Sequence, residues 1–167
     1  MSLRLKVASL IGKYAVLIGA TAITINTGVE YRSTIDVGAN IPLNMKIDDF
    51  LKKLIKDAEA EGLKVEIDPD EIERLRSGLV GKIRVSGVPV DLKIKPVCRY
   101  VTRNLFGRKV KVLPISELLK DRLDLLERFI DVRQLLDIVI LLSKGGDEAW
   151  SLAVKHKNFI LFKKRVL

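Results

Sequence analysis

The pattern of apolar residues changes at Pro114, and this change limits the folds open to the 167-residue chain. Before Pro114, short apolar runs typical of strands alternate with segments of helical period. From Ile115 onward every periodic segment is helical. We therefore expect an α+β protein, with a mixed sheet and flanking helices over residues 1–113 and a C-terminal helical bundle over residues 114–167.

Periodicity and chain-breaking residues place the individual elements. Helices are expected at 3–11, 20–26, 47–58, 115–130, 135–142 and 148–164, and strands at 14–18, 31–41, 63–67, 79–85 and 88–94. Asp68-Pro69 is expected to start a short segment, helical or turn, that runs through Arg76. Ser86-Gly87 joins the last two strands as a hairpin, and Gly145-Gly146 ends a helix. Two short apolar runs, 97–101 and 110–113, flank a basic loop, Arg103–Lys109.

Composition excludes some chemistry and suggests partners. The single cysteine, Cys98, rules out an internal disulfide framework and cysteine-rich zinc clusters. We interpret Cys98 as a small core residue and His156, the single histidine, as a surface residue. A formal charge of +9 favours polyanionic partners such as RNA, DNA or nucleotides. The abundance of Ile, Val, Leu, Lys and Glu is typical of a thermophile.

The N-terminal apolar stretch Tyr14–Ile25 resembles a signal peptide only weakly. It is shorter than the roughly 20 residues that span a bilayer, and no cleavage site in a polar context follows it. We interpret it as a buried strand running into a helix. The expected location is cytoplasmic, with no membrane partner.

The first candidate site is a glycine-containing turn between a strand and a helix. Gly19-Ala20-Thr21 follows the run 14–18, and Asp36 lies on the next expected strand. Free N–H groups at a helix N-terminus bind phosphates, and a nearby carboxylate can hold the magnesium that bridges them. The alternative is a tight turn beside a surface aspartate.

The second candidate is Asp91 with Lys93. Alternation directs Val88, Val90, Leu92 and Ile94 to one face of the strand, so Asp91 and Lys93 share the other. Asp91 could be a metal ligand or a base that activates a hydroxyl. The spacing Asp91-Leu92-Lys93 also fits a nuclease core, although its partner acid normally lies closer. The remaining alternative is the exposed polar face of an antiparallel sheet.

Two helical segments after Pro114 carry charged residues at regular spacing. One is Glu117-Leu118-Leu119-Lys120-Asp121-Arg122-Leu123, and the other is Arg133-Gln134-Leu135-Leu136-Asp137. Arg133 and Asp137 stand four residues apart on a helix and can pair. The alternative is a salt-bridged helix surface, typically worth under about 1 kcal/mol per pair.

In this order, the segments resemble the nucleotidyltransferase-like proteins of the AbiEii toxin group, in the polymerase-beta-type nucleotidyltransferase superfamily. The resemblance covers about residues 14–145. It rests on Leu17-Ile18-Gly19-Ala20-Thr21-Ala22, on Arg32-Ser33-Thr34-Ile35-Asp36-Val37, on Val90-Asp91-Leu92, and on the two helical segments. The order and spacing of these motifs carry the resemblance, since none of them is specific alone.

The resemblance implies a nucleotidyltransferase-like fold and a function. Mg²⁺ is expected on Asp36 and Asp91, which would be catalytic, and a nucleoside triphosphate at Gly19, Ala20, Thr21, Arg32, Arg122 and Asp137. If active, the protein would transfer a nucleotide to a hydroxyl of RNA such as tRNA, or of a protein. A toxin-like role with an antitoxin-like protein partner is also implied.

Departures from the family pattern leave a second interpretation open. The second aspartate of the family's Asp-x-Asp pair falls on Gly38, which cannot ligate a metal, and the second glycine of the turn is Ala20. The family's lysine falls on Arg122, and the Asp after Arg133 is Gln134. Two metal ions normally clamp the phosphoryl group, with the paired aspartates holding both. Glu30 or Asn40 could assist a single ion. The alternative is a degenerate module that binds a nucleotide, RNA or a partner without chemistry.

A separate basic segment is the candidate nucleic-acid surface. Its residues are Arg99, Arg103, Arg108 and Lys109, near Tyr100 and Phe106. Basic side chains between aromatic ones suit a nucleic-acid backbone and an unstacked base. A solvated loop is the alternative.

Overall fold

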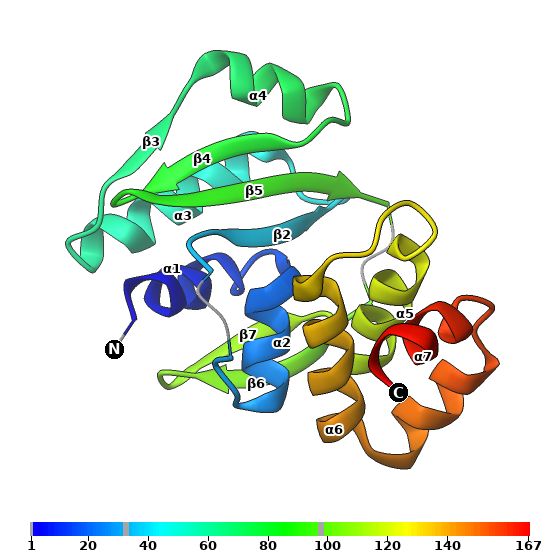
Figure 1. The fold of residues 1–167 in the computed structure, drawn as a ribbon. Helices are drawn as coiled ribbons and strands as arrows, with labels where there is room; N and C mark the ends of the chain where they lie inside the picture. Colours follow the sequence, from blue (N-terminus) through cyan, green and yellow to red (C-terminus); the bar gives the residue numbers. More distant parts are fainter. Residues whose placement is uncertain (1, 32–33, 97–98) are drawn as a thin grey trace.

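The computed structural model describes residues 2–31, 34–96 and 99–167. Over these residues, strands form one sheet in the order β3-β4-β5-β2-β1-β7-β6 (Figure 1). The strands are β1 Val16–Ile18, β2 Val37–Pro42, β3 Val65–Ile67, β4 Gly81–Val85, β5 Val88–Lys95, β6 Val101–Leu105 and β7 Arg108–Val112. The helices are α1 Leu3–Ile11, α2 Gly19–Thr27, α3 Ile47–Ala60, α4 Pro69–Arg76, α5 Ile115–Leu125, α6 Val132–Lys155 and α7 Phe159–Val166.

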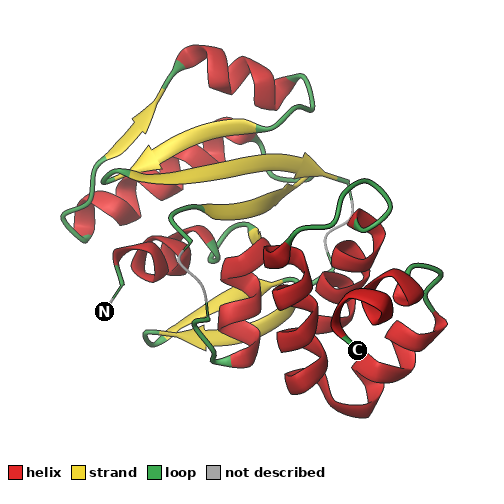
Figure 2. Cartoon of the chain, in the orientation of Figure 1, coloured by secondary structure: helices red, strands yellow, loops and turns green. Residues whose placement is uncertain are grey.

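The sheet is mixed, as expected. Central strands β1 and β2 are antiparallel, whereas β1 runs parallel to β7 and β2 runs parallel to β5. Antiparallel hairpins β4–β5 and β6–β7 lie on either side of this centre. Helices α1, α3 and α4 cover one face, and α2 packs with α5 and α6 on the other (Figure 2). The α+β class with a helical C-terminal part is therefore confirmed.

Alternation along β2 and β5 fixes which side chains face the core. Val37, Ala39 and Ile41 are fully buried on the side of α1 and α3, as are Val90 and Leu92. Full burial of such a side chain contributes about 1.5–3 kcal/mol, so a one-residue slip of either strand would be costly. The intervening residues of both strands are thereby held on the opposite face.

The expected basic loop Arg103–Lys109 is a β-hairpin, so that interpretation was wrong. Strands β6 and β7 meet at a turn in which Phe106 and Gly107 both have positive φ. The middle of β6, Thr102–Asn104, is polar and exposed on both sides because β6 is the last strand of the sheet. Such a strand shows no apolar alternation. Cys98 and the start of the run 97–101 lie outside the described residues.

The strand expected at 31–41 begins only at Val37, and Asp36 precedes it. Ile35, which suggested an earlier start, is 77% exposed. Residues 32–33, including the candidate Arg32, lie outside the described part of the chain. Asp36 thus lies in the segment that enters β2 rather than on the strand itself.

The C-terminal helices also differ in their bounds. Helix α5 ends at Leu125, and α6 bends at Gly146, whose φ of 66° and ψ of −158° are not helical. The helix expected at 148–164 breaks before Asn158, because the buried Asn158 side chain donates to the Leu123 carbonyl oxygen. His156 is not a free surface residue: its side chain is only 12% exposed and hydrogen-bonds Asp124. No helix in the described residues combines the length and apolar character that crossing a membrane requires.

Candidate active site

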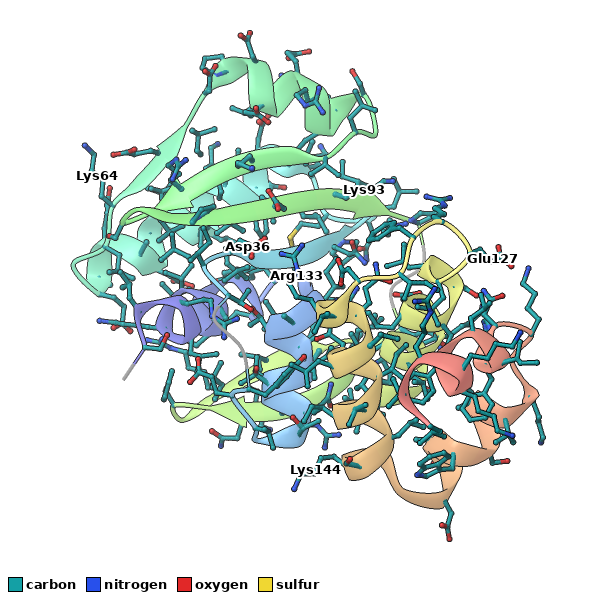
Figure 3. All side chains as sticks on the ribbon, viewed as in Figure 1. Asp36, Lys64, Lys93, Glu127, Arg133 and Lys144 are labelled. Carbon is teal, nitrogen blue, oxygen red and sulfur yellow. The ribbon has the colours of Figure 1, made fainter. Side chains whose placement is uncertain are left out.

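A cleft of about 740 Å³ lies between the sheet and the helices α2, α5 and α6. Its lining comes from the β1–α2 turn, the entry to β2 and β2 itself, Val80 before β4, strand β5, helix α5, the connection to α6 and the start of α6. Its lining includes the predicted residues Gly19, Ala20, Thr21, Asp36, Asp91, Arg122 and Asp137. Figure 3 shows Asp36 near β2, Lys93 on β5 and Arg133 near the start of α6, around this region.

Strand register places the two candidate metal ligands on one face. Asp91 of β5 pairs with Gly38 of β2 in the parallel ladder, and Asp36 precedes Gly38 by two residues. Side chains two residues apart on an extended chain point the same way, so both carboxylates face the cleft. The Asp91 Oδ1 atom is buried and accepts no hydrogen bond from the described residues, but it lies 3.7 Å from Lys82 Nζ.

Gly38 leaves a gap in the row of side chains beside Asp91. A Cβ atom built on Gly38 would lie 3.1 Å from Ile18 Cγ1, so the neighbouring strand fills part of this space with an apolar group. The carboxylate pair needed to clamp two ions is therefore absent, and a two-metal centre does not fit. No group of three or more His, Cys, Asp or Glu side chains within the described ranges could hold a metal.

One magnesium ion fits the residues better. Mg²⁺ is commonly bound through one or two carboxylates, with substrate phosphates and waters completing its shell. Asp36 and Asp91 provide two carboxylates, and Asp91 Oδ1 accepts no hydrogen bond from the described residues. Glu30, expected as an additional ligand of a single ion, instead forms an ion pair with Arg4, in which Glu30 Oε1 lies 3.3 Å from Arg4 Nη2. Asn40 does line the cleft.

The turn between β1 and α2 presents a helix N-terminus to the cleft. Gly19 has a φ of +66°, a conformation that side-chain-bearing residues rarely adopt, and α2 begins there. The first N–H groups of a helix have no intrahelical partners, and the helix dipole adds partial positive charge. A Cβ on Gly19 would lie 3.8 Å from Arg122 Nη2, so the guanidinium stands beside this end of α2.

The Thr21 side chain has a structural role. It is 1% exposed, accepts a hydrogen bond from Arg4 Nη1 at 2.5 Å and lies 3.4 Å from the Asp36 carbonyl oxygen, to which it donates. The hydroxyl thus ties the turn to α1 and to the entry of β2, and only the backbone of Thr21 remains for a ligand. Sequence reasoning missed Arg4; its signal was a charged residue within the apolar helix 3–11.

A buried ion pair holds Arg122 in place. Arg122 Nε lies 2.9 Å from Asp137 Oδ2, and Asp137 is 1% exposed. Tyr31 donates a 2.5 Å hydrogen bond to the other carboxylate oxygen of Asp137. Arg133, expected to pair with Asp137, lies 3.6 Å from Asp131. The ion pair with Asp137 therefore fixes the orientation of the Arg122 side chain in the cleft.

Two further features of the cleft were not singled out as site residues. Gln134 is 6% exposed, and its Oε1 atom accepts no hydrogen bond from the described residues. The sequence signal for Gln134 was its place in the Arg133–Asp137 segment. Loss of solvent raises the pKa of the Asp121 carboxyl, and the nearby Arg122 guanidinium offsets part of this rise.

The candidate nucleic-acid residues lie on or near the β6–β7 hairpin. Arg99 pairs with Glu117 at 2.7 Å, and Arg103 Nε donates to Asn26 Oδ1 at 3.1 Å. Arg108 donates to Ser9 Oγ and pairs with Glu61. Lys109 is exposed. Three of the four side chains thus already contact their own chain.

Comparisons with known proteins place the fold. No protein-family model matches the sequence, and no curated protein matches it. JHP933 from Helicobacter pylori has a similar structure: TM-score 0.62, 18% identity, covering 96% of this chain and 72% of that one. An antigenic nucleotidyltransferase-like protein from Paracoccidioides brasiliensis matches with TM-score 0.58 and 17% identity, over 98% of this chain and 89% of that one.

A third similar structure is ANT(2″)-Ia in complex with adenylyl-2″-tobramycin. It matches with TM-score 0.56 and 13% identity, over 98% of this chain and 95% of that chain. At these identities the likeness shows the fold alone. The chain therefore has a nucleotidyltransferase-like fold.

Proposed function

We propose that the cleft binds a nucleoside triphosphate with one Mg²⁺, and that the chain is a divergent relative of the AbiEii toxin group. The observation that carries the proposal is the convergence of a helix N-terminus, an arginine and two carboxylates on one cleft. A phosphate chain needs N–H donors and positive charge, and its magnesium needs carboxylates. These groups come from segments more than 100 residues apart in the sequence.

Each group has a role in binding. The backbone N–H groups of Gly19, Ala20 and Thr21 bind phosphate oxygens, and Arg122 adds positive charge beside them. Asp36 and Asp91 hold the ion, which neutralises phosphate charge and polarises the phosphoryl group when bound. Asp137 orients Arg122 through their ion pair.

The proposed reaction is transfer of a nucleotide to a hydroxyl of RNA such as tRNA, or of a protein. The acceptor oxygen forms a bond to the α-phosphorus, the bond from this phosphorus to the leaving oxygen breaks, and pyrophosphate departs. Asp91 accepts the hydroxyl proton. ANT(2″)-Ia, solved in complex with adenylyl-2″-tobramycin, has a similar fold. A toxin-like role with an antitoxin-like protein partner is part of this proposal.

A second candidate is nucleotide binding without transfer. Gly38 and the Ile18 side chain next to it favour this candidate, because they occupy the place of the second aspartate with apolar surface. Lys82, 3.7 Å from Asp91 Oδ1, also competes with a cation for that carboxylate. A nuclease that uses Asp91 and Lys93 is a weaker alternative.

Calorimetric titration with Mg²⁺ and each of the four nucleoside triphosphates tests binding. We expect binding to the native chain, its loss in Asp36→Asn, and its retention in Asp49→Asn, a matched change on the exposed side of α3. Absence of binding for all four nucleotides would contradict both candidates.

A nucleoside triphosphate labelled with ³²P at its α-phosphate then distinguishes nucleotide transfer from binding without transfer. Label transferred to tRNA or protein supports the enzyme, and binding without transfer supports the second candidate. Metal-dependent cleavage of labelled RNA, lost in Lys93→Ala, would favour the nuclease instead.

A further inference from the structure

The floor of the cleft continues onto a strongly basic part of the sheet. Lys82 and Arg84 of β4 face the same side as Asp91, because the hairpin register pairs Lys82 with Asp91 and Arg84 with Pro89. Lys93 and Lys95 follow Asp91 at alternate positions of β5 and line the cleft. We call these four residues, Lys82, Arg84, Lys93 and Lys95, the basic sheet face.

No helix of the described chain covers the basic sheet face. Helices α3 and α4 lie on the other side of β4 and β5, where Leu75 of α4 packs against Gly81. In Figure 1 the near side of β4 and β5 is open, while α5 and α6 lie beyond β2. Lys82 and Arg84 are exposed to solvent. The open side of the cleft is therefore bordered by cations.

Cations outnumber acidic residues on the strands of this face, and at its edge the Glu71 carboxylate of α4 accepts a hydrogen bond from the Lys82 backbone N–H. Asp91 is the one acidic residue among those of β4 and β5 that point this way, against four cations. Glu66 of β3 lies opposite Arg84 at the edge of the sheet and is 3.8 Å from Lys64. Arg84 and Lys93 form no ion pair with any described residue. Their charges are thus available to a ligand, unlike those of Arg99 and Arg108, which pair with Glu117 and Glu61.

We propose that the basic sheet face binds the sugar-phosphate backbone of a single RNA strand. Lysine and arginine side chains are the usual contacts to nucleic-acid phosphates, and alternate residues on a strand present them about 6.6 Å apart. No aromatic or large aliphatic side chain points to this side from residues 82–95. Protein interfaces are depleted in lysine, whereas nucleic-acid interfaces are polar and strongly positive, so RNA fits this face better than an acidic protein.

The position of the face gives it a function in the proposed transfer. Helices α5 and α6 bound the cleft on one side, so an acceptor reaches Asp36 and Asp91 over β4 and β5. An RNA end bound along the basic sheet face would bring its hydroxyl to these carboxylates. This last step rests on the proposed function, whereas binding of RNA to the face does not.

The test is binding of a fluorescent single-stranded RNA, measured by anisotropy over a series of salt concentrations. We expect the double variant Arg84→Gln, Lys93→Gln to bind the RNA at least tenfold more weakly than the native chain at low salt. The slope of log K against log salt should fall by about 1.4, as for two lost single-strand phosphate contacts. The matched control, Lys52→Gln with Lys56→Gln, removes two exposed charges from α3 on the opposite side of the sheet and should bind RNA normally.

Several outcomes would overturn the proposal. These are absence of RNA binding by the native chain, equal loss in the control variant, and binding of poly-glutamate as tight as that of RNA, which would point to an acidic protein. Nucleotide titration of the same samples separates the two proposals. If the native chain binds nucleotide but not RNA, only the proposal of an RNA-binding surface is refuted. If RNA binding is weakened in the basic-face variant and not in the control, while the native chain binds no nucleotide, only the proposed function is refuted.

Discussion

Gly38 is the residue that most limits the chemistry of the cleft. It pairs with Asp91, has no positive φ, and could carry a side chain if Ile18 moved by a few tenths of an ångström. We expect Gly38→Asp to tighten Mg²⁺ binding about tenfold, because a third carboxylate would join Asp36 and Asp91. Titration calorimetry measures this affinity. Gly38→Asn adds similar bulk without charge, and an equal gain in that variant would contradict the argument.

Gln134 combines deep burial with a carbonyl oxygen that accepts no hydrogen bond from the described part of the chain. Such an orphaned acceptor costs about 1–3 kcal/mol, and a ligand donor such as a nucleobase amine or a ribose hydroxyl could offset this cost. We expect Gln134→Leu to keep or raise the free energy of unfolding while weakening nucleotide binding about tenfold. Urea unfolding and titration calorimetry measure the two effects. A more stable variant with unchanged nucleotide affinity would show that this oxygen has no ligand.

The pair between Arg122 and Asp137 has consequences for stability as well as for binding. Removing one partner of a buried pair typically costs about 3–5 kcal/mol, because the other charge stays buried. We expect Arg122→Met to lower the free energy of unfolding by about 3 kcal/mol, and the double variant Arg122→Met with Asp137→Leu to recover most of this loss. Neither should bind nucleotide as the native chain does. A double variant that binds normally would remove Arg122 from the site.

At the scale of elements, one carboxylate links α3 to the segment between α1 and β1. Asp57 accepts hydrogen bonds from Lys13 Nζ at 2.8 Å and from the Tyr14 hydroxyl at 2.5 Å. Burial raises the pKa of Asp57, but these two hydrogen bonds outweigh burial and hold the pKa below its ordinary value of 3.8. The folded state therefore favours the charged form. This stabilisation is present above the ordinary value and is lost as pH falls through the lowered pKa.

We accordingly expect Asp57→Asn to be less stable than the native chain at pH 7. The difference between the two should shrink as pH falls below 3.8, where the native carboxylate takes up a proton. Urea unfolding measured from about pH 7, where the carboxyl is charged, down to about pH 2.5, where it takes up its proton, measures both. A difference that stays constant with pH would mean that the carboxylate charge contributes nothing.

Elements with one buried face could be predicted from the sequence, and those without could not. Helices α1 and α3 and the β4–β5 hairpin were expected and are confirmed, because their apolar spacing and turn residues are local signals. The segment through Arg76, for which helix and turn were both open, is the helix α4. The β6–β7 hairpin was missed because β6 is polar on both faces at the edge of the sheet. The break before α7 depends on Asn158 reaching the Leu123 carbonyl oxygen, a contact across 35 residues.

The same distinction applies to the cleft. Asp91 and Lys93 could be assigned to one face from alternation alone, and their burial agrees. The hydrogen bond from Arg4 to Thr21 and the ion pair between Arg122 and Asp137 depend on how the helices pack. No local pattern encodes these contacts. The roles assigned to the cleft residues stay predictions until the titrations are made.

For the whole molecule, the boundary expected at residue 113 falls between the end of β7 and the start of α5. The buried residues nevertheless form one cluster that includes Ile23 of α2, Leu119 of α5 and Ile138 of α6. The cleft also draws residues from both parts. We therefore propose that residues 1–113 and 114–167 fold as one cooperative unit, although they differ in architecture.

Trp150, the single tryptophan, makes this testable because it reports on the C-terminal helices. Its ring meets Phe159 of α7 edge-on, with centroids 6.4 Å apart. If the core is continuous, Trp150 fluorescence and far-ultraviolet circular dichroism should show one unfolding temperature. Phe162→Ala empties a core position on α7 at a cost of about 3–5 kcal/mol. It should lower the unfolding temperature measured by fluorescence and the one measured by circular dichroism by the same amount. If it lowers only the fluorescence transition, the C-terminal helices unfold by themselves, and the cleft would lose Arg122 and Asp137 while its sheet remained folded.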